Sequence, residues 1–148
     1  MYIQPQVRND GQGSGYYKAP RGARYHKGID FEAMPGHLIK SHVAGRVSKL
    51  GICYADDHQF KYVEIIDYTG EFRHRFFYVL PAVAVGDYIE ANQVIGNVQN
   101  IAGRYPKNQE RPAMVNHVHY EVLDTKGADY DPMQFLLHLA DPDTVLTA

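Results

Sequence analysis

The sequence has one cysteine, no long apolar run and no excess of basic residues, and each of these excludes a class of protein. With Cys53 alone, neither an intramolecular disulfide nor a zinc cluster of thiolates can form, and its apolar neighbours predict an ordinary buried thiol. No segment approaches the roughly 18 apolar residues that a membrane-spanning helix needs. A formal net charge of −2 without a basic stripe argues against nucleic acid as the main partner.

Glycine and proline, by contrast, are frequent and divide the chain into short pieces. There are 13 glycines and 8 prolines in 148 residues, but no low-complexity linker that could separate two domains. We therefore expect a single domain over residues 1–148, which is long enough to bury one core. The glycine-rich segment Gly11–Gly15 is not followed by the Lys-Ser or Lys-Thr pair of a phosphate-binding loop, so we interpret it as a flexible loop.

Most of the pieces between these breaks have the composition of β-strands. Tyr68–Glu71 predicts a hairpin turn between two of them, and the one helix expected is Met133–Leu139, with Asp131 as its cap and Pro132 in its first turn. The fold class predicted is therefore mostly β: an antiparallel sheet domain with a short C-terminal helix. The expected strands, rich in Val, Ile, Tyr and Phe, are His42–Lys49, Lys61–Tyr68, Phe72–Leu80, Gln93–Gln99 and His117–Leu123.

Two segments bring histidines and a carboxylate together in metal-binding patterns. The first contains His26 and, four residues later, Asp30; the second contains His117 and His119 in a strand-like run. Successive side chains of a strand point to opposite faces, so His117, His119 and Glu121 share one face. The apolar residues between them would meet the core, and the two histidines would line one exposed groove.

These residue types match the ligands of a catalytic zinc ion. Such a site takes three nitrogen or oxygen ligands and leaves a fourth position for water, a count that one carboxylate and two imidazoles satisfy. Manganese or cobalt could occupy the same groups. Each pattern alone is also common among surface histidines, but both patterns in one β-rich chain form a more specific signal. The remaining histidine of the pair could act on the water or on a substrate.

Several motifs in the same order resemble peptidase family M23, the lysostaphin-type zinc metallopeptidases that cleave bacterial peptidoglycan. The resemblance extends over about residues 11–136. It rests on His26–Phe31 (His-x-Gly-x-Asp-Phe), Val43–Val47, Tyr62–Asp67, Val85–Asp87 followed by Gln93–Gly96, His117–Val122 (His-x-His-x-Glu-Val), and Asp131-Pro132 with Phe135-Leu136.

The resemblance implies a role for each residue of the metal-binding patterns. His26, Asp30 and His119 would bind one Zn²⁺ ion, and His117 would accept a proton from the metal-activated water that attacks a peptide bond of peptidoglycan. Because no signal peptide is visible at the N-terminus, we expect a protein that acts in the cell wall or periplasm or is carried in a virion, and that otherwise stays in the cytoplasm until release.

One position departs from the family pattern. Active members usually carry a further histidine in the strand before the Val-Gly-Asp turn, where this chain has Tyr78, or Val79 after a shift of one residue. A tyrosine hydroxyl can donate a hydrogen bond to a developing oxyanion, so we assign Tyr78 a catalytic role. His74 and His58 could also reach the groove, or they could be buried or solvated histidines with local hydrogen bonds.

The same departure leaves other functions open. In the vertebrate LECT-type relatives of the family a similar replacement accompanies zinc binding without peptidase activity. The alternatives are therefore a catalytically weak or inactive zinc-containing binding module and a structural component of a phage or tail-like assembly. For a peptidase, Tyr25 and Tyr105 are expected to provide aromatic walls for the substrate, although tyrosines are also ordinary strand residues.

Overall fold

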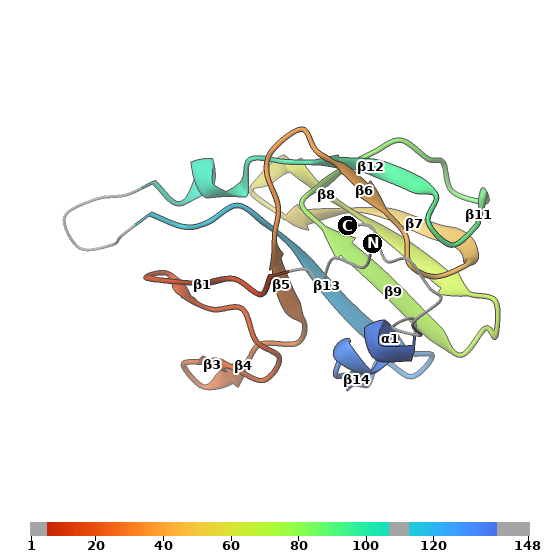
Figure 1. Ribbon diagram of the computed structural model, residues 1–148, viewed down its shortest axis with the longest axis horizontal. Coiled ribbons are helices and arrows are strands. Elements are labelled where there is room, and N and C mark those ends of the chain that lie inside the picture. The colour runs from red at the N-terminus through yellow and green to blue at the C-terminus, as the bar shows by residue number, and fades with distance from the viewer. Residues whose placement is uncertain (1–5, 107–112, 139–148) are drawn as a thin grey trace.

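The computed structural model describes residues 6–106 and 113–138, and these residues form mostly β-strands (Figure 1). A 3₁₀ turn, η1, spans Ile101–Arg104, and one α-helix, α1, spans Met133–His138. The strands are β1 (Asn9–Asp10), β2 (Gly13–Ser14), β3 (Pro20–Arg21), β4 (Arg24–Tyr25), β5 (Ile29–Glu32), β6 (Leu38–Lys40), β7 (Gly45–Tyr54), β8 (Asp57–Asp67), β9 (Phe72–Phe77), β10 (Val79–Pro81), β11 (Tyr88–Ile89), β12 (Val94–Val98), β13 (His117–Asp124) and β14 (Asp129–Tyr130).

The largest sheet is antiparallel and has seven strands. Its order is β11-β7-β8-β9-β13-β14, and β5 also pairs with β13. Strand β13 therefore has β9 along one edge, while β5 and then β14 share its other edge. The short hairpins β1–β2 and β3–β4 lie beside β5, on the side away from β7 (Figure 1).

A second sheet, of order β10-β12-β6, contributes to the same core. Val79 from β10 and Ile95 from β12 are fully buried in one cluster with Val63 and Ile65 of the large sheet. The apolar face predicted for the His-x-His strand is confirmed, because the core cluster also contains Val118, Tyr120 and Val122. The opposite face of β13 is thereby left for the histidines.

Four of the predicted strands are confirmed with shifted ends, but Phe72–Leu80 is wrong as a single strand. It breaks at Tyr78, whose φ of 68° is in the left-handed region, so β9 and β10 belong to different sheets. The loop expected at Gly11–Gly15 is wrong in part: Gly11 and Gln12 form the turn of a hairpin, but Gly13–Ser14 is its second strand, β2. The helix is confirmed over the described residues, and Asp131 Oδ1 accepts the Met133 amide at 3.0 Å, whereas Leu139 lies outside them.

A network of buried polar side chains lies in the core, on the apolar face of β13. The Tyr120 hydroxyl is 2.7 Å from His42 Nε2 and 2.7 Å from His74 Nδ1, and His74 Nε2 is 3.1 Å from Asp67 Oδ2. His74 is fully buried, on the face of the sheet opposite the metal-binding pattern. The suggestion that His74 reaches the groove is therefore wrong, because strand alternation directs its ring into the core.

The burial of His42 predicts loss of stability in mild acid. Burial lowers the pKa of His42 from 6.5 to about 3, so the folded chain excludes a proton that the unfolded chain binds below pH 6.5. Between pH 6.5 and pH 5 this histidine should reduce the free energy of unfolding by about 2 kcal/mol. We expect His42→Gln to flatten this part of the curve of stability against pH, measured by urea unfolding.

The exposed histidine His58 provides the control for this experiment, since its ring lies outside the buried polar network and is 3.0 Å from the carbonyl of Ala55. His58→Gln should leave the slope of the parent unchanged. Equal slopes for the parent and His42→Gln would show that the burial of His42 does not govern acid stability.

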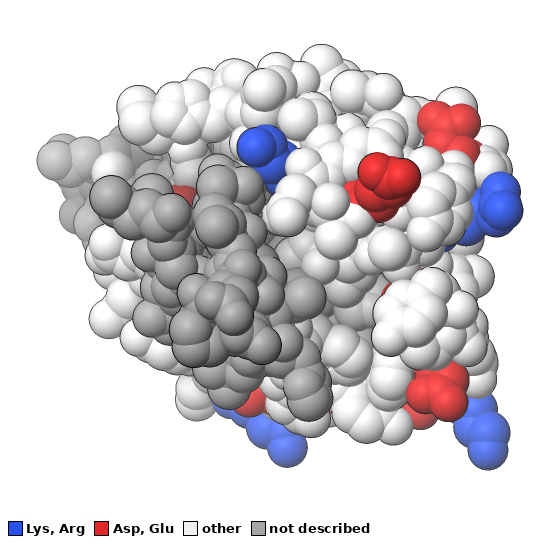
Figure 2. Space-filling model, turned by 45° about the vertical axis from the view of Figure 1, so that its right-hand side comes forward, with Lys and Arg blue, Asp and Glu red and all other residues white. Residues whose placement is uncertain are grey.

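Neither a membrane-spanning helix nor, on the face shown in Figure 2, a continuous charged patch is seen among the described residues. Within the described ranges, no helix is long and apolar enough to cross a membrane. On the face shown in Figure 2, the charged side chains of the described residues are scattered, and blue and red groups do not form a continuous patch of one sign.

Candidate metal centre

The pairing of β5 with β13 builds the predicted site. Asp30 lies directly opposite His119 in the register of the two strands, and His26 directly follows β4, three residues before β5 begins. The segment between them passes close to β13 at Gly28, where a Cβ atom would lie 2.4 Å from the Tyr120 carbonyl oxygen and 2.9 Å from His119 Cε1. Only glycine permits this approach, which brings the imidazole of His26 beside that of His119.

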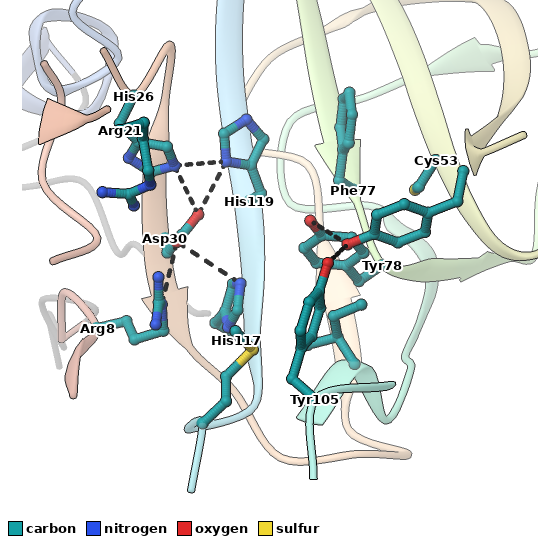
Figure 3. A pocket seen from close by; sticks show the side chains of 13 residues that line it. Arg8, Arg21, His26, Asp30, Cys53, Phe77, Tyr78, Tyr105, His117 and His119 are labelled. Carbon is teal, nitrogen blue, oxygen red and sulfur yellow. Dashed lines mark hydrogen bonds and ion pairs between the residues drawn. The ribbon is translucent and has the colours of Figure 1, made fainter. Parts of the chain in front are cut away.

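Three side-chain atoms converge at this point (Figure 3). His26 Nε2 is 3.0 Å from His119 Nδ1 and 3.2 Å from Asp30 Oδ1, and His119 Nδ1 is 2.8 Å from Asp30 Oδ1. In a tetrahedral zinc site with bonds of 2.0–2.1 Å, ligand atoms are about 3.3 Å apart. The three atoms predicted as ligands are thus spaced almost as a zinc ion requires.

Hydrogen bonds to the other ring nitrogens orient both imidazoles. His26 Nδ1 is 3.1 Å from the Tyr16 carbonyl oxygen, and His119 Nε2 is 2.9 Å from Glu121 Oε1. Each of these nitrogens must donate, so in the neutral rings the nitrogens that face the centre present lone pairs. Two lone pairs and a carboxylate oxygen at such distances need a cation among them, and the donor set therefore fits zinc.

The pKa shifts of Asp30 and His119 also agree with a metal-binding site. Burial alone would raise the pKa of Asp30, but hydrogen bonds from His119 and His26 hold the pKa of this carboxyl well below its usual range. Burial alone would lower the pKa of His119, but its contacts with Asp30 and Glu121 outweigh burial and raise the pKa to about 9. A cluster that attracts a proton this strongly without a metal also favours a metal cation in its place.

The second histidine of the pair, His117, lies beside the ligand cluster rather than in it. Its Nε2 is 3.6 Å from Asp30 Oδ2, and its Nδ1 is 2.8 Å from the Val115 carbonyl oxygen. Its side chain is 4% exposed and that of His119 is 12% exposed. Both histidines line one pocket, as expected, but the expectation that they are exposed is wrong, because both side chains are largely buried.

Opposite the histidines, three tyrosine hydroxyls form the other wall of this pocket, whose volume is about 230 Å³ (Figure 3). The Tyr105 hydroxyl donates to that of Tyr54 at 3.0 Å, and the hydroxyls of Tyr54 and Tyr78 are 3.2 Å apart. The ring of Tyr78 packs edge-on against His117, with centroids 5.3 Å apart. Of the two residues that matched the missing histidine, Tyr78 lines the pocket whereas Val79 is fully buried in the core.

Of three other residues considered from the sequence, Tyr25, Cys53 and His58, only Cys53 lines the pocket. Tyr25 does not line the pocket: it is 44% exposed and its hydroxyl contacts Asp129 Oδ1 at 2.9 Å. Cys53 is only partly buried and does line the pocket, and burial raises the pKa of its thiol to about 11, so the thiol is protonated at neutral pH. His58 is exposed and reaches only a nearby carbonyl.

Sequence patterns indicated none of three further polar residues that line the pocket. Arg8 and Arg21 come from the N-terminal hairpins, and Tyr54 comes from the end of β7. Arg8 contacts Asp30, 22 residues away, and Tyr54 contacts Tyr78, 24 residues away. No short motif includes either pair, so only the tertiary structure reveals them.

Comparison with protein families gives one match. The model of peptidase family M23 matches residues 24–132, a range that includes His26, Asp30, His117 and His119. A comparison with curated protein sequences finds no match.

Solved structures share this fold at low sequence identity. The solution structure of lysostaphin is 23% identical with a TM-score of 0.66, and the alignment covers 91% of this chain and 55% of that one. The catalytic domain of lysostaphin from Staphylococcus simulans, described as an antimicrobial peptidase, is 22% identical over 90% of this chain and 99% of the domain, with a TM-score of 0.63. LytU is 21% identical, covering 95% and 90% of the two chains, with a TM-score of 0.67.

Proposed function

Because the chain belongs to peptidase family M23, we propose that it is a zinc-dependent endopeptidase that hydrolyses peptide bonds of bacterial peptidoglycan. One observation supports this above all: His26 Nε2, Asp30 Oδ1 and His119 Nδ1 converge within 3.2 Å of one another. When bound there, zinc supplies a Lewis acid that polarises a carbonyl group and lowers the pKa of water to near 7.

His117 is suited to accept a proton from the attacking water. Its Nδ1–H donates to the Val115 carbonyl, so its Nε2 carries a lone pair toward the cluster. Burial lowers the pKa of His117, which keeps the ring neutral and able to take up a proton at neutral pH. The same ring can then return this proton to the leaving amine.

Tyr78 is suited to stabilise the oxyanion that forms when water attacks a peptide carbonyl. Burial raises the pKa of its hydroxyl, so the group stays protonated and can donate. Tyr105 donates to Tyr54, which can donate in turn to Tyr78 and leave the proton of Tyr78 directed to the pocket. Such a chain polarises its last donor and strengthens the bond that it offers.

Removing the Tyr78 hydroxyl should slow hydrolysis without loss of metal. Tyr78→Phe keeps the ring beside His117, and we expect the turnover rate to fall by about 10²–10³-fold, as for loss of one oxyanion donor. Measuring kcat for release of amines from purified peptidoglycan, together with bound zinc, tests this. Tyr68→Phe, which removes the hydroxyl of a residue that is 81% exposed and does not line the pocket, is the control, and an equal loss in both variants would exclude this role for Tyr78.

A zinc-containing binding module is the main alternative, since Tyr78 replaces the usual histidine. The two functions differ in one assay. The zinc-loaded chain is incubated with purified peptidoglycan, with and without a chelator, and new amines are quantified. Chelator-sensitive release supports the peptidase. Stoichiometric zinc without any release would instead favour a binding module or a structural component of an assembly.

A further inference from the structure

The N-terminal segment that precedes the family match packs directly against the metal-binding carboxylate. The Arg8 amide donates to the Asp30 carbonyl at 2.7 Å, and the Asp30 amide donates to the Gly15 carbonyl at 2.9 Å. Gly15 is enclosed so tightly that a Cβ would lie 2.7 Å from the Arg8 carbonyl oxygen and 2.9 Å from Asp30 Cβ. Arg8 is thereby fixed beside Asp30 (Figure 3).

The guanidinium of Arg8 bridges two carboxylates inside the protein. Its Nε donates to Asp30 Oδ2 at 3.1 Å and its Nη1 donates to Asp10 Oδ1 at 2.9 Å. The three side chains are only 4%, 4% and 7% exposed for Arg8, Asp30 and Asp10. Because Arg8 holds Oδ2 of Asp30, only Oδ1 faces His26 and His119, and the carboxylate can offer a metal ion just one oxygen.

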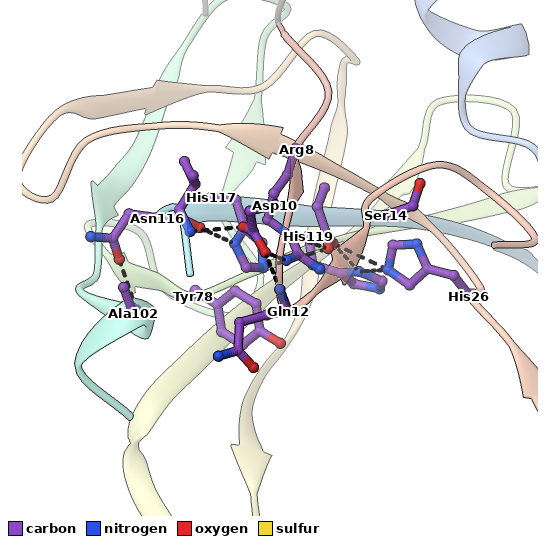
Figure 4. Close-up of polar contacts among 12 residues, drawn as sticks. Arg8, Asp10, Gln12, Ser14, His26, Tyr78, Ala102, Asn116, His117 and His119 are labelled. Carbon is purple, nitrogen blue, oxygen red and sulfur yellow. Dashed lines mark hydrogen bonds and ion pairs between the residues drawn. The ribbon is translucent and has the colours of Figure 1, made fainter. Parts of the chain in front are cut away.

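Asp10, which holds the guanidinium of Arg8, is also linked to His117 through the backbone of Val115. Its Oδ2 accepts the Val115 amide at 2.8 Å, and the carbonyl of Val115 accepts His117 Nδ1 at 2.8 Å. One hairpin residue thus holds Arg8 on one side and, on the other, the backbone that orients His117. Figure 4 shows Arg8, Asp10 and His117 together in this arrangement.

We propose that Arg8, held by Asp10, is a positioning residue of the metal centre that orients Asp30 for binding a metal ion through a single oxygen. This inference rests on the proposed function, because it concerns the same site. Family membership does not supply it, since the match begins at residue 24. Outer contacts that orient a ligand typically contribute 10–100-fold to metal affinity, which sets the size of the expected effect.

Replacing Arg8 with a neutral residue would change metal affinity in opposite directions, depending on whether Arg8 acts through its charge or by orienting Asp30. Removing a positive charge beside a cation site would by itself tighten metal binding. Loss of orientation would weaken it, because the freed carboxylate must be ordered again when the ion binds. The sign of the change in affinity therefore separates a positioning residue from a mere neighbouring charge.

The experiment measures the dissociation constant for Co²⁺ of the full chain and its variants by competition with a coloured chelator. We expect Arg8→Gln to bind Co²⁺ 10–100-fold more weakly than the parent. Arg8→Lys keeps the charge but not the two-pronged geometry, and its affinity should fall between those of the parent and Arg8→Gln. Arg46→Gln is the control, because Arg46 is exposed, does not line the pocket and donates to the Gly86 carbonyl at 3.1 Å, and the affinity of this variant should stay within about twofold of the parent.

Unchanged or tighter binding by Arg8→Gln overturns the proposal. If that variant does not fold, Arg8→Lys carries the test, and an affinity equal to that of the parent overturns it. A parent chain that binds no cobalt overturns both this inference and the proposed function. A parent that binds cobalt and cleaves peptidoglycan, with Arg8 variants that bind equally well, overturns only this inference.

Discussion

Replacing His119 with alanine is expected to abolish both stoichiometric zinc binding and hydrolysis of peptidoglycan. His119 Nδ1 lies 3.0 Å from His26 Nε2 and 2.8 Å from Asp30 Oδ1, so its loss leaves two ligands where a catalytic zinc site needs three. Zinc per chain is measured by mass spectrometry after dialysis, and activity by release of amines from peptidoglycan. We expect the zinc content and the activity of the variant to be as low as those of the chelator-treated parent.

His58→Ala is the control for this experiment, because it removes a histidine that is exposed and distant in structure from the cluster. This variant should keep full metal content and full activity. If His119→Ala retains one zinc ion per chain, or cleaves as well as the parent, His119 is not a ligand of the catalytic ion.

Replacing His117 with alanine is expected to separate binding from catalysis. Its Nε2 lies 3.6 Å from Asp30 Oδ2 and its other nitrogen is engaged by a backbone carbonyl, so it is placed to exchange a proton rather than to hold the metal. The variant should bind one zinc ion while kcat falls by about 10²–10⁴-fold, as for loss of a general base. Metal content and turnover are measured on the same preparation.

Loss of metal in His117→Ala would assign His117 to the ligand set instead. Retention of both metal and full turnover would exclude it from catalysis. The comparison with His119→Ala is well matched, since the two histidines lie on the same face of β13, two residues apart.

The metal-binding strand could be predicted because its signal is local. Alternation alone placed Val118, Tyr120 and Val122 in the core and the histidines on the other face, and β13 has this arrangement. The contact of Asp30 with His119 followed from the family motif, whereas its physical cause is the register of β5 and β13. A register between distant strands is not encoded in any short segment.

The break at Tyr78 could not be predicted from composition. Phe72–Leu80 has the residues of a continuous strand, and a non-glycine residue with φ of 68° is uncommon. Tertiary contacts hold this conformation: the Tyr78 amide donates to the Lys61 carbonyl at 2.8 Å, and the Gln99 amide donates to the Tyr78 carbonyl at 2.9 Å. The break directs Tyr78 into the pocket while Val79 enters the core.

The contacts between the N-terminal hairpins and the metal centre could not be predicted from the sequence either. Strands β1 to β4 have two residues each, too few for any periodicity to be read. The glycines of Gly11–Gly15 suggested a loop, yet Gly15 is needed for its close approach to Asp30. Arg8 and Asp10 acquire their importance only because this hairpin packs beside β5.

Diffraction from crystals of the zinc-loaded chain, recorded on both sides of the zinc absorption edge, tests the central claim most directly. We expect one anomalous peak per chain, about 2.0–2.2 Å from each of His26 Nε2, Asp30 Oδ1 and His119 Nδ1. A zinc-loaded crystal without a peak among these three atoms, or with its zinc ion bound elsewhere, would contradict it.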